Sequence, residues 1–461
     1  METKGVSSAI ISAVRVGVVE QLNSIAKYPF DGERIQCVEK QFVTTLGKSG
    51  ASGLSELFSQ NDERSKAITY NGQKHYRKFI ALGRYLTLLG EISLKRGIYQ
   101  SNTAKRSICP LEVKLKFIND YVSFAAAEYI CYGLASMTLA EFVKHCKKWT
   151  LMKPSEGTVK RVLEYVGNFL ETEGYMHSIV SVQTVPKKAV TLAMSMDSTS
   201  VLIRKQGWKH ATAATVSTYD AKGRRLDTVY IGRMPEKGKT HAKRLLENEV
   251  QSITRKHKFK HIVCIADGAR DLWLFFRKKY PDAIHVVDFF HVCEHLSKLS
   301  GLFFKDSSDA KAWYEKQRTT LKEDSNGAAK VIRAVRYRRS KAKENQEIES
   351  ELKYLQHNRR RMNYFELQQN NLPIGSGVVE AACKNLIGAR MKKSGMRWTV
   401  EGGQTILSSR PVSSSIQMVS ALDYASPHAA TAYHKVTSSQ IPVGPGPSQN
   451  RACAIHAHGS S

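Results

Sequence analysis

Apolar positions along the first 170 residues recur mostly at the three- to four-residue interval of amphipathic helices. We therefore expect residues 1–110 to form a mainly α-helical N-terminal region. Within 111–180, Thr138 begins a capping box and Ser155 precedes a second apolar helix. Two short capped helices joined by a polar connector are typical of a helix-turn-helix, and equally of an ordinary helical bundle.

The helix-turn-helix interpretation assigns DNA-reading side chains to the second of these helices. Its exposed N-terminal end would present Thr158, Lys160 and Arg161 to the edges of bases. In an ordinary bundle the same side chains would only face solvent. The sequence leaves both interpretations open, and we treat 111–180 as a helix-turn-helix-like DNA-binding region.

Past Pro186 the apolar pattern changes to the continuous runs and two-residue alternation of β-strands. Five segments are predicted to be strands, with helices between the third, fourth and fifth: 190–197, 210–220, 224–232, 261–267 and 283–288. Three meandering strands followed by alternating helices and strands predict a mixed α/β sheet. Such connections fit a ribonuclease H-like fold, with the first strand central and the fourth beside it.

The rest of the chain divides by composition. The first part of the predicted core covers 187–288, and a basic helical insertion follows over 289–371. A C-terminal catalytic helix is expected over 372–407. The segment 408–461 is rich in Ser, Ala, Pro and Gly, which cannot easily bury a core, so we expect a disordered, atypical tail.

The chain is strongly basic, with a formal net charge of +29 over 461 residues. Such a charge attracts polyanions, and release of counterions from a nucleic-acid backbone would supply much of the affinity. Ribosome-like packing and attraction to a membrane surface are alternatives, but catalytic-looking carboxylates accompany the basic residues and favour nucleic acid. No run of eighteen apolar residues occurs, so a membrane span is not expected.

The cysteines give no sign of a disulfide framework. Eight of them are scattered without any C-x-x-C pair, which indicates reduced thiols in a cytosolic protein and argues against a zinc ribbon. His291 and His295 lie one helical turn apart beside Cys293, but no second ligand pair accompanies them. We interpret all three as satisfied polar residues and leave zinc binding open.

Three acidic residues carry the candidate chemistry. Asp197 and Asp267 each close an apolar run, and Glu380 lies on a helix that also carries Lys384 one turn later. Because neighbouring strands are about 4.8 Å apart, carboxylates that end adjacent strands can share one hard cation such as Mg²⁺. A strand cap at Asp197 and a simple Asp267-Gly268 turn are the structural alternatives. Basic residues that we expect to bind DNA phosphates follow on the glutamate helix: Lys384, Arg390, Lys392, Lys393 and Arg397.

Three segments resemble the DDE transposases of the ISKra group of bacterial insertion sequences. They are DGARDLW, YPDAIHVVDFFHVCEHL and LPIGSGVVEAACKNLIGARMKKSGMRW, and the resemblance covers roughly residues 110 to 407. It implies a ribonuclease H-like core, two Mg²⁺ ions with Mn²⁺ as a substitute, and the triad Asp197, Asp267 and Glu380. Asp288 and His291 match the family's pattern as neighbours of that triad.

The resemblance also implies partners and a mechanism. The partners would be double-stranded DNA, as element ends and as target, and further copies of the chain, in the nucleoid of a bacterial cytoplasm. Our own hypothesis for the metal roles is that Asp197 would bridge two ions, with Asp267 completing one site and Glu380 the other. Water would cut the DNA first, and the released 3′-hydroxyl would then attack the target.

Two departures from the family keep other functions open. Only Cys109 remains of a cysteine-paired stretch common in related transposases, and the segment 408–461 replaces an expected further helix. One alternative is a DNA-binding regulator that has lost its chemistry. The other is a ribonuclease H-like, structure-specific nuclease that cuts DNA without joining it.

Overall fold

The structure is a computed structural model that divides the chain into two compact units. The first comprises residues 1–170 and 413–461, and the second comprises 171–412. The tail prediction for 408–461 lies almost wholly outside the described residues. These are residues 8–27, 32–102, 107–172, 185–413 and 434–435. None of the helices within these ranges is long and apolar enough to cross a bilayer.

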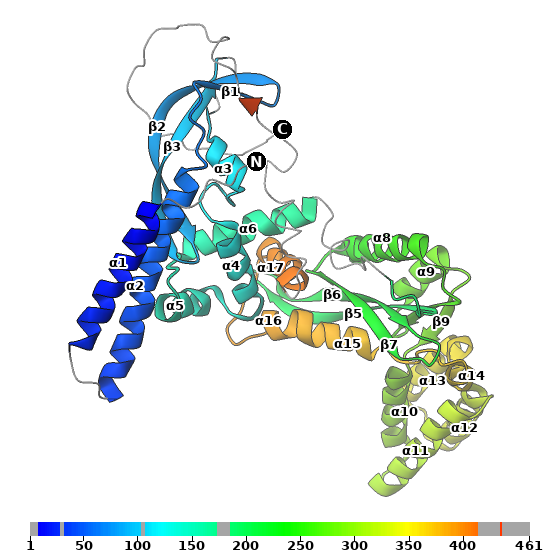
Figure 1. Ribbon diagram of the computed structural model, residues 1–461. Coiled ribbons are helices and arrows are strands. Elements are labelled where there is room, and N and C mark those ends of the chain that lie inside the picture. Colours follow the sequence, from blue (N-terminus) through cyan, green and yellow to red (C-terminus); the bar gives the residue numbers. More distant parts are fainter. Residues whose placement is uncertain (1–7, 28–31, 103–106, 173–184, 414–433, 436–461) are drawn as a thin grey trace. The chain divides into compact units, whose positions relative to one another are not determined.

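The first unit begins with two helices and continues as an antiparallel sheet (Figure 1). The helices are α1 (Ser8–Ala26) and α2 (Gly32–Ser59). The strands, in the order β10-β1-β2-β3-β4, are β1 (Ala67–Tyr70), β2 (Gln73–Thr87), β3 (Gly90–Ser101), β4 (Ser107–Ile108) and β10 (His434–Lys435).

The prediction of a mainly helical region over 1–110 is therefore wrong beyond residue 66. Asn71 and Gly72 have φ values of 48° and 73°, the left-handed conformation that a two-residue hairpin turn requires. An Asn-Gly pair between segments with many aromatic residues is a strong hairpin signal, and the helical interpretation overlooked it. The Tyr-rich, basic stretch around this turn is the β1–β2 hairpin.

Four helices complete the described part of this unit: α3 (Pro110–Leu115), α4 (Phe124–Ser136), α5 (Leu139–Trp149) and α6 (Glu156–Thr172). The predicted capping box of α5 is present, because Thr138 and Glu141 exchange hydrogen bonds of 2.7 and 3.1 Å. Ser155 caps α6 by accepting a hydrogen bond from the Thr158 N–H at 3.1 Å.

The second unit contains a mixed five-stranded sheet in the order β7-β6-β5-β8-β9. Its strands are β5 (Thr191–Ile203), β6 (Gly207–Tyr219), β7 (Arg225–Arg233), β8 (His261–Ala266) and β9 (Ile284–Val287). The first three are antiparallel, whereas β8 and β9 join β5 in parallel. The predicted mixed α/β sheet is confirmed, with the first strand central and the fourth beside it.

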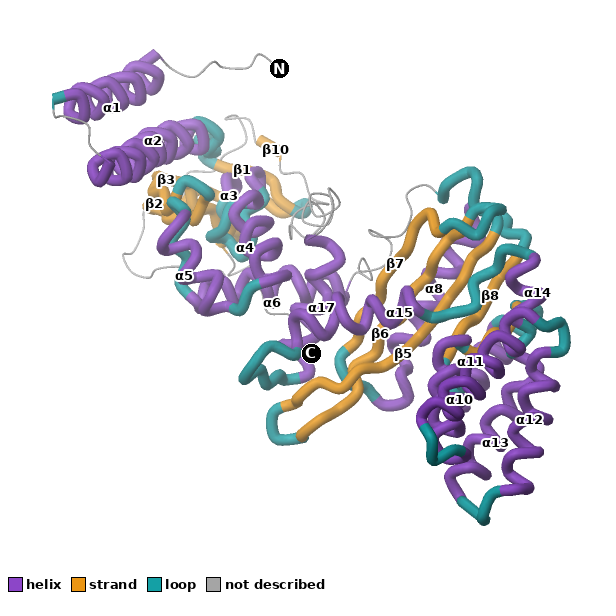
Figure 2. Tube along the Cα trace, turned by 90° about the horizontal axis from the view of Figure 1, so that it is seen from below, coloured by secondary structure: helices purple, strands orange, loops and turns teal. Residues whose placement is uncertain are grey.

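Helices cover both faces of this sheet (Figures 1 and 2). The short turn η1 (Lys237–Lys239) leads into α8 (Thr240–Lys256), which packs on β6 and β7, and α9 (Arg270–Lys279) connects β8 to β9. On the opposite face lies a helix in three parts, α15 (Gly377–Ala382), the π-helical segment η3 (Cys383–Gly388) and α16 (Ala389–Met391), followed by α17 (Val400–Ser413).

Between β9 and α15 the chain is helical throughout and forms a bundle (Figure 2). Its helices are α10 (Phe289–Phe303), α11 (Ser307–Glu323), α12 (Gly327–Lys341), α13 (Gln346–Asn358), η2 (Arg359–Arg361) and α14 (Tyr364–Gln369). The bundle shares one continuous apolar core with the sheet, to which Phe289, Leu296 and Leu355 contribute as fully buried side chains. The bundle is thereby part of this unit's folding core.

Candidate functional site

Asp197 does not end its strand, contrary to the prediction, because β5 continues to Ile203. It lies instead where the parallel pairing with β8 stops. The last paired residues are Ser195 and Ile265, so the register continued by two residues puts Asp197 level with Asp267, just past the end of β8. The two aspartates therefore occupy matching levels of adjacent strands, as carboxylates that share a site must.

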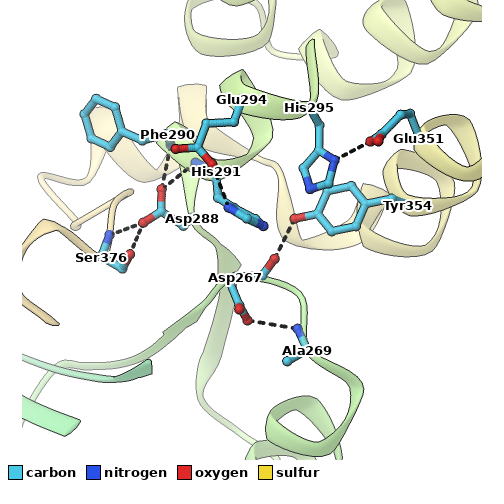
Figure 3. A network of polar contacts seen from close by, with 10 residues as sticks. All are labelled: Asp267, Ala269, Asp288, Phe290, His291, Glu294, His295, Glu351, Tyr354 and Ser376. Carbon is cyan, nitrogen blue, oxygen red and sulfur yellow. Dashed lines mark hydrogen bonds and ion pairs between the residues drawn. The ribbon is translucent and has the colours of Figure 1, made fainter. Parts of the chain in front are cut away.

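The turn that carries Asp267 is fixed on both sides. Its carboxylate accepts a hydrogen bond from the Ala269 N–H at 3.0 Å, and its backbone carbonyl accepts one from the Tyr354 hydroxyl at 2.7 Å (Figure 3). Gly268 has a φ of 109°, and a Cβ there would come within 2.6 Å of the Tyr354 ring. Glycine is thus required twice over, by its backbone conformation and by the close approach of the ring.

The helix that carries Glu380, α15, lies on the opposite face of the sheet from α8 (Figure 1). Helix α15 packs on β5 and β6, and the next segment, η3, brings the Cys383 thiol to the Asp197 carboxylate, with Sγ 3.7 Å from Oδ2. Burial, and then the charge of Asp197, raises the pKa of Cys383 to about 12, so the thiol keeps its proton at neutral pH and donates to Asp197. Single π-helical turns within α-helices are frequent at functional sites, and this one begins three residues after Glu380.

The carboxylates influence one another electrostatically. Burial raises the pKa of Asp197 and the charge of Asp267 adds to that effect, while the Ser198 N–H and Lys239 oppose it. The pKa of Glu380 is raised by burial, then by Asp288 and Asp197, against the lowering effect of Lys384. Burial is the larger cause in both cases, and the neighbouring carboxylates add to it. Perturbed carboxyl groups of this kind are candidates for a functional site.

Asp288 fastens the glutamate helix to the sheet. It is 1% exposed and caps α10, with Oδ1 accepting from the backbone N–H groups of Phe290 and His291 at 2.6 and 3.1 Å (Figure 3). Its other oxygen accepts from both the N–H and the hydroxyl of Ser376, the residue before α15. The two oxygens of Asp288 thus accept four hydrogen bonds, and two of these hold the N-terminal end of the helix that carries Glu380.

Two histidines flank this region, each paired with a carboxylate. His291 contacts Glu294 through Nδ1 at 3.2 Å, and His295 contacts Glu351. His295 also stacks on Tyr354, with ring centroids 3.8 Å apart. Each histidine thus has one ring nitrogen paired, whereas Nε2 of His295 is buried without a hydrogen-bond partner. Within the described residues, no group of three possible ligands that could hold a metal ion includes either of them.

The candidate site offers the type of donor atom that a hard divalent cation needs, but not, among the described residues, the close convergence of three ligands. Asp197, Asp267 and Glu380 offer only oxygen atoms, the ligands that Mg²⁺ prefers. Across the described ranges, no group of three His, Cys, Asp or Glu side chains converges as closely as a bound ion would require. One oxygen of each aspartate is instead engaged by a backbone N–H of its own segment, from Ser198 or Ala269.

The residues predicted to bind DNA fall into two groups. Thr158 and Arg390 are only 7% and 2% exposed, so they cannot read or grip DNA, and those two predictions are wrong. Thr158 is held by the α6 cap, and Arg390 lies 5.1 Å from the centre of the Trp398 ring. The remaining residues are exposed or partly exposed: Lys160, Arg161, Lys384, Lys392, Lys393 and Arg397.

Lys392 lies close to the strand that carries Asp197. Its Nζ lies 2.5 Å from the hydroxyl of Thr199. Thr199 is two residues after Asp197 on β5, so both side chains project from the same face of the strand, about 7 Å apart along it. A lysine at this distance places a positive charge beside the site.

Several residues of the site were not anticipated from the sequence. Tyr354 and Ser376 act on residues 87 and 88 positions away, a separation that leaves no local pattern. Lys239, just before α8, is a further cation near Asp197. Its φ of 55° follows Gly238 at 65°, and the Gly-Lys pair was the only local signal of this sharp turn.

Comparisons with known proteins add little to this picture. No protein-family model matches the chain, and no curated protein matches it. Among solved structures, a chain of a Drosophila P element transposase strand transfer complex is similar with a TM-score of 0.26 and 9% identity, over 63% of this chain and 78% of that chain. A likeness this weak carries no argument, so the function has to be argued from the site itself.

Proposed function

We propose that this chain is a DDE-type transposase, similar to those of the ISKra group, which cuts DNA at element ends and transfers a 3′-hydroxyl into target DNA. One observation carries the proposal. Asp197 on β5 lies level with Asp267, just past the end of the parallel strand β8, and the helix of Glu380 packs against β5. A central strand with antiparallel neighbours on one side and parallel ones on the other is also the ribonuclease H-like order.

Residues of this chain would bind the metal ions and attract the DNA. Asp197, Asp267 and Glu380 would hold Mg²⁺ through oxygen. A cation would offset the burial and, after it, the neighbouring negative charges that raise the pKa values of Asp197 and Glu380. When bound, magnesium supplies activation of the attacking oxygen and stabilisation of the leaving oxygen. Lys392 and Lys239 would attract the DNA phosphates toward the carboxylates, because both are cations near Asp197.

Asp267→Asn tests the catalytic assignment. We expect this variant to lose Mg²⁺-dependent strand cleavage and to keep its affinity for DNA, since an amide of the same shape still accepts the Ala269 N–H but binds magnesium poorly. The matched control is Asp271→Asn. Asp271 lies four residues later in an exposed ion pair with Lys243, so this change should leave cleavage unaltered.

The assay would combine a DNA fragment carrying the sequences that flank the coding region, Mg²⁺ and a target plasmid. Joined products support a transposase. Nicks without joining would favour a nuclease, and retarded DNA without nicks would favour a regulator. Cleavage by Asp267→Asn at the wild-type rate would remove Asp267 from the site.

A further inference from the structure

A second polar cavity lies in the same unit, away from the carboxylates. It has a volume of about 230 Å³ and opens between the start of β9 and the segment that runs from η2 to the end of α14. Arg360, Arg361, Asn363 and Asn370 line it with hydrogen-bond donors. It lies beside Ile284, whereas Asp288 follows the other end of β9, about 13 Å away along the strand.

Positive charge at this cavity is not neutralised. Among the described residues, neither Arg360 nor Arg361 has a carboxylate oxygen within 4.0 Å. Glu366, the cavity's single carboxylate, is exposed at its edge and also outside any such pair. Two arginines therefore face one unpaired glutamate, which leaves a net positive cavity.

Two contacts fix the orientation of the Arg361 side chain. Its guanidinium lies 4.4 Å from the centre of the Trp273 ring and donates one hydrogen bond to the Asn358 side chain at 2.9 Å. Burial and the nearby charge of Arg277 lower the pKa of Arg361. The charged guanidinium is therefore less favourable in the folded chain than in the unfolded chain. A guanidinium fixed by stacking and by one amide keeps its other N–H groups available for a planar or tetrahedral oxyanion.

We propose that this cavity binds a phosphate group of the DNA backbone. One phosphate with part of its sugar fits the volume, which far exceeds the roughly 10–15 Å³ that a single water needs. The identity of the donor as DNA rests on the proposed function, whereas the preference for an oxyanion rests on the cavity alone.

Four single variants of the full-length chain test the site. Arg361→Gln should weaken the binding of inorganic phosphate about tenfold, as expected for one lost charge-assisted hydrogen-bond pair. Arg360→Gln should also weaken phosphate binding. Because Arg360 is exposed, this variant should fold normally even if Arg361→Gln does not. Glu366→Gln should strengthen binding, because it removes the opposing charge. Arg359→Gln is the matched control, an exposed arginine of the same turn outside the cavity.

Phosphate binding would be followed by isothermal titration calorimetry, and DNA binding by fluorescence anisotropy of a labelled duplex. Opposite effects of Arg361→Gln and Glu366→Gln on both ligands support the proposal. Equal losses from Arg359→Gln and Arg361→Gln, or no saturable phosphate binding, overturn it. Loss of phosphate binding with unchanged DNA affinity overturns the assignment to DNA in favour of a free phosphate compound. If phosphate and DNA binding behave as expected but the wild-type chain never cuts DNA, the proposed function is contradicted while the phosphate site is still supported.

Discussion

Asp197 carries a charge that the folded chain disfavours unless a cation accompanies it. Burial and Asp267 raise its pKa, so this carboxyl binds its proton more tightly in the folded state than in the unfolded state. Its contribution to the free energy of unfolding is therefore greatest below its unfolded pKa of 3.8 and is lost as the pH rises through the folded pKa. At neutral pH without metal, the ionised carboxylate destabilises the fold.

Asp197→Asn should therefore raise the Tm of the metal-free chain at pH 7. The amide keeps an acceptor for the Ser198 N–H and removes the charge. For a unit of this size each 1 kcal/mol shifts Tm by about 2–4 °C. The gain should shrink as the pH falls toward 4, and Mg²⁺ should raise the Tm of the wild type but not that of the variant.

Differential scanning calorimetry over a pH series measures both effects, with Asp271→Asn as the control for an ordinary surface aspartate. A variant that is less stable than the wild type at every pH would contradict the electrostatic account. Asp197 would then act only as a hydrogen-bond acceptor for its own strand.

Two tyrosines of the helical bundle hold the ends of adjacent strands. The Tyr354 hydroxyl donates to the carbonyl of Asp267 after β8, and the Tyr364 hydroxyl donates to the carbonyl of Val287 at the end of β9, at 2.7 and 2.8 Å. The two hydrogen bonds are chemically alike. They differ in that only the first fixes a residue that carries a candidate catalytic carboxylate.

Tyr354→Phe should therefore raise the Mg²⁺ concentration needed for half-maximal cleavage, by about tenfold, while Tyr364→Phe should leave that concentration unchanged. Each variant loses one hydrogen bond to a backbone carbonyl, worth about 1 kcal/mol of stability. The bond of Tyr364 is buried and that of Tyr354 is partly buried, so the control should lose at least as much stability as Tyr354→Phe. Magnesium titrations of strand cleavage provide the measurement. Equal shifts in both variants would mean that the bundle affects the site only through stability.

The elements of the second unit were predictable because their signals are local. Period and length alone indicated the five strands and the helices between them, since one face of each element must be apolar. The prediction for the first unit was wrong because helical spacing was inferred over β2 and β3. The Asn71-Gly72 turn instead makes this part of the chain a β-hairpin. The burial of Thr158 and Arg390 could not be predicted from the local sequence pattern either, because tertiary packing determines which side of a helix is covered.

The candidate site was predictable in part for the same reason. Asp197 and Asp267 follow recognisable apolar runs, so their approach could be expected from sheet geometry. The extension of β5 past Asp197 could not be predicted, because Thr199 and Ser200 are polar residues that interrupt the apolar run, although they pair with β6. Contacts such as those of Tyr354 and Ser376 join segments more than 80 residues apart and require the folded chain.

At the scale of the whole molecule, the net charge of +29 predicts DNA binding that depends strongly on salt. Each phosphate neutralised by a lysine or arginine adds about 0.9 to the slope of log affinity against log salt. A chain that makes six to ten such contacts would lose roughly 10³–10⁵ in affinity between 50 and 200 mM salt. The slope thus counts contacts, and single variants reveal which residues make them.

This measurement decides between the two interpretations of α6. Lys160 and Arg161 are exposed at its start, and the pair between Lys160 and Glu164 at 3.6 Å is too exposed to hold the lysine strongly. If α6 lies on DNA, Lys160→Gln and Arg161→Gln should each reduce the slope by about 1, while Lys114→Gln, an exposed lysine of α3, should not. An unchanged slope in the Lys160→Gln, Arg161→Gln double variant would make α6 an ordinary bundle helix. DNA binding would then have to depend on basic residues elsewhere.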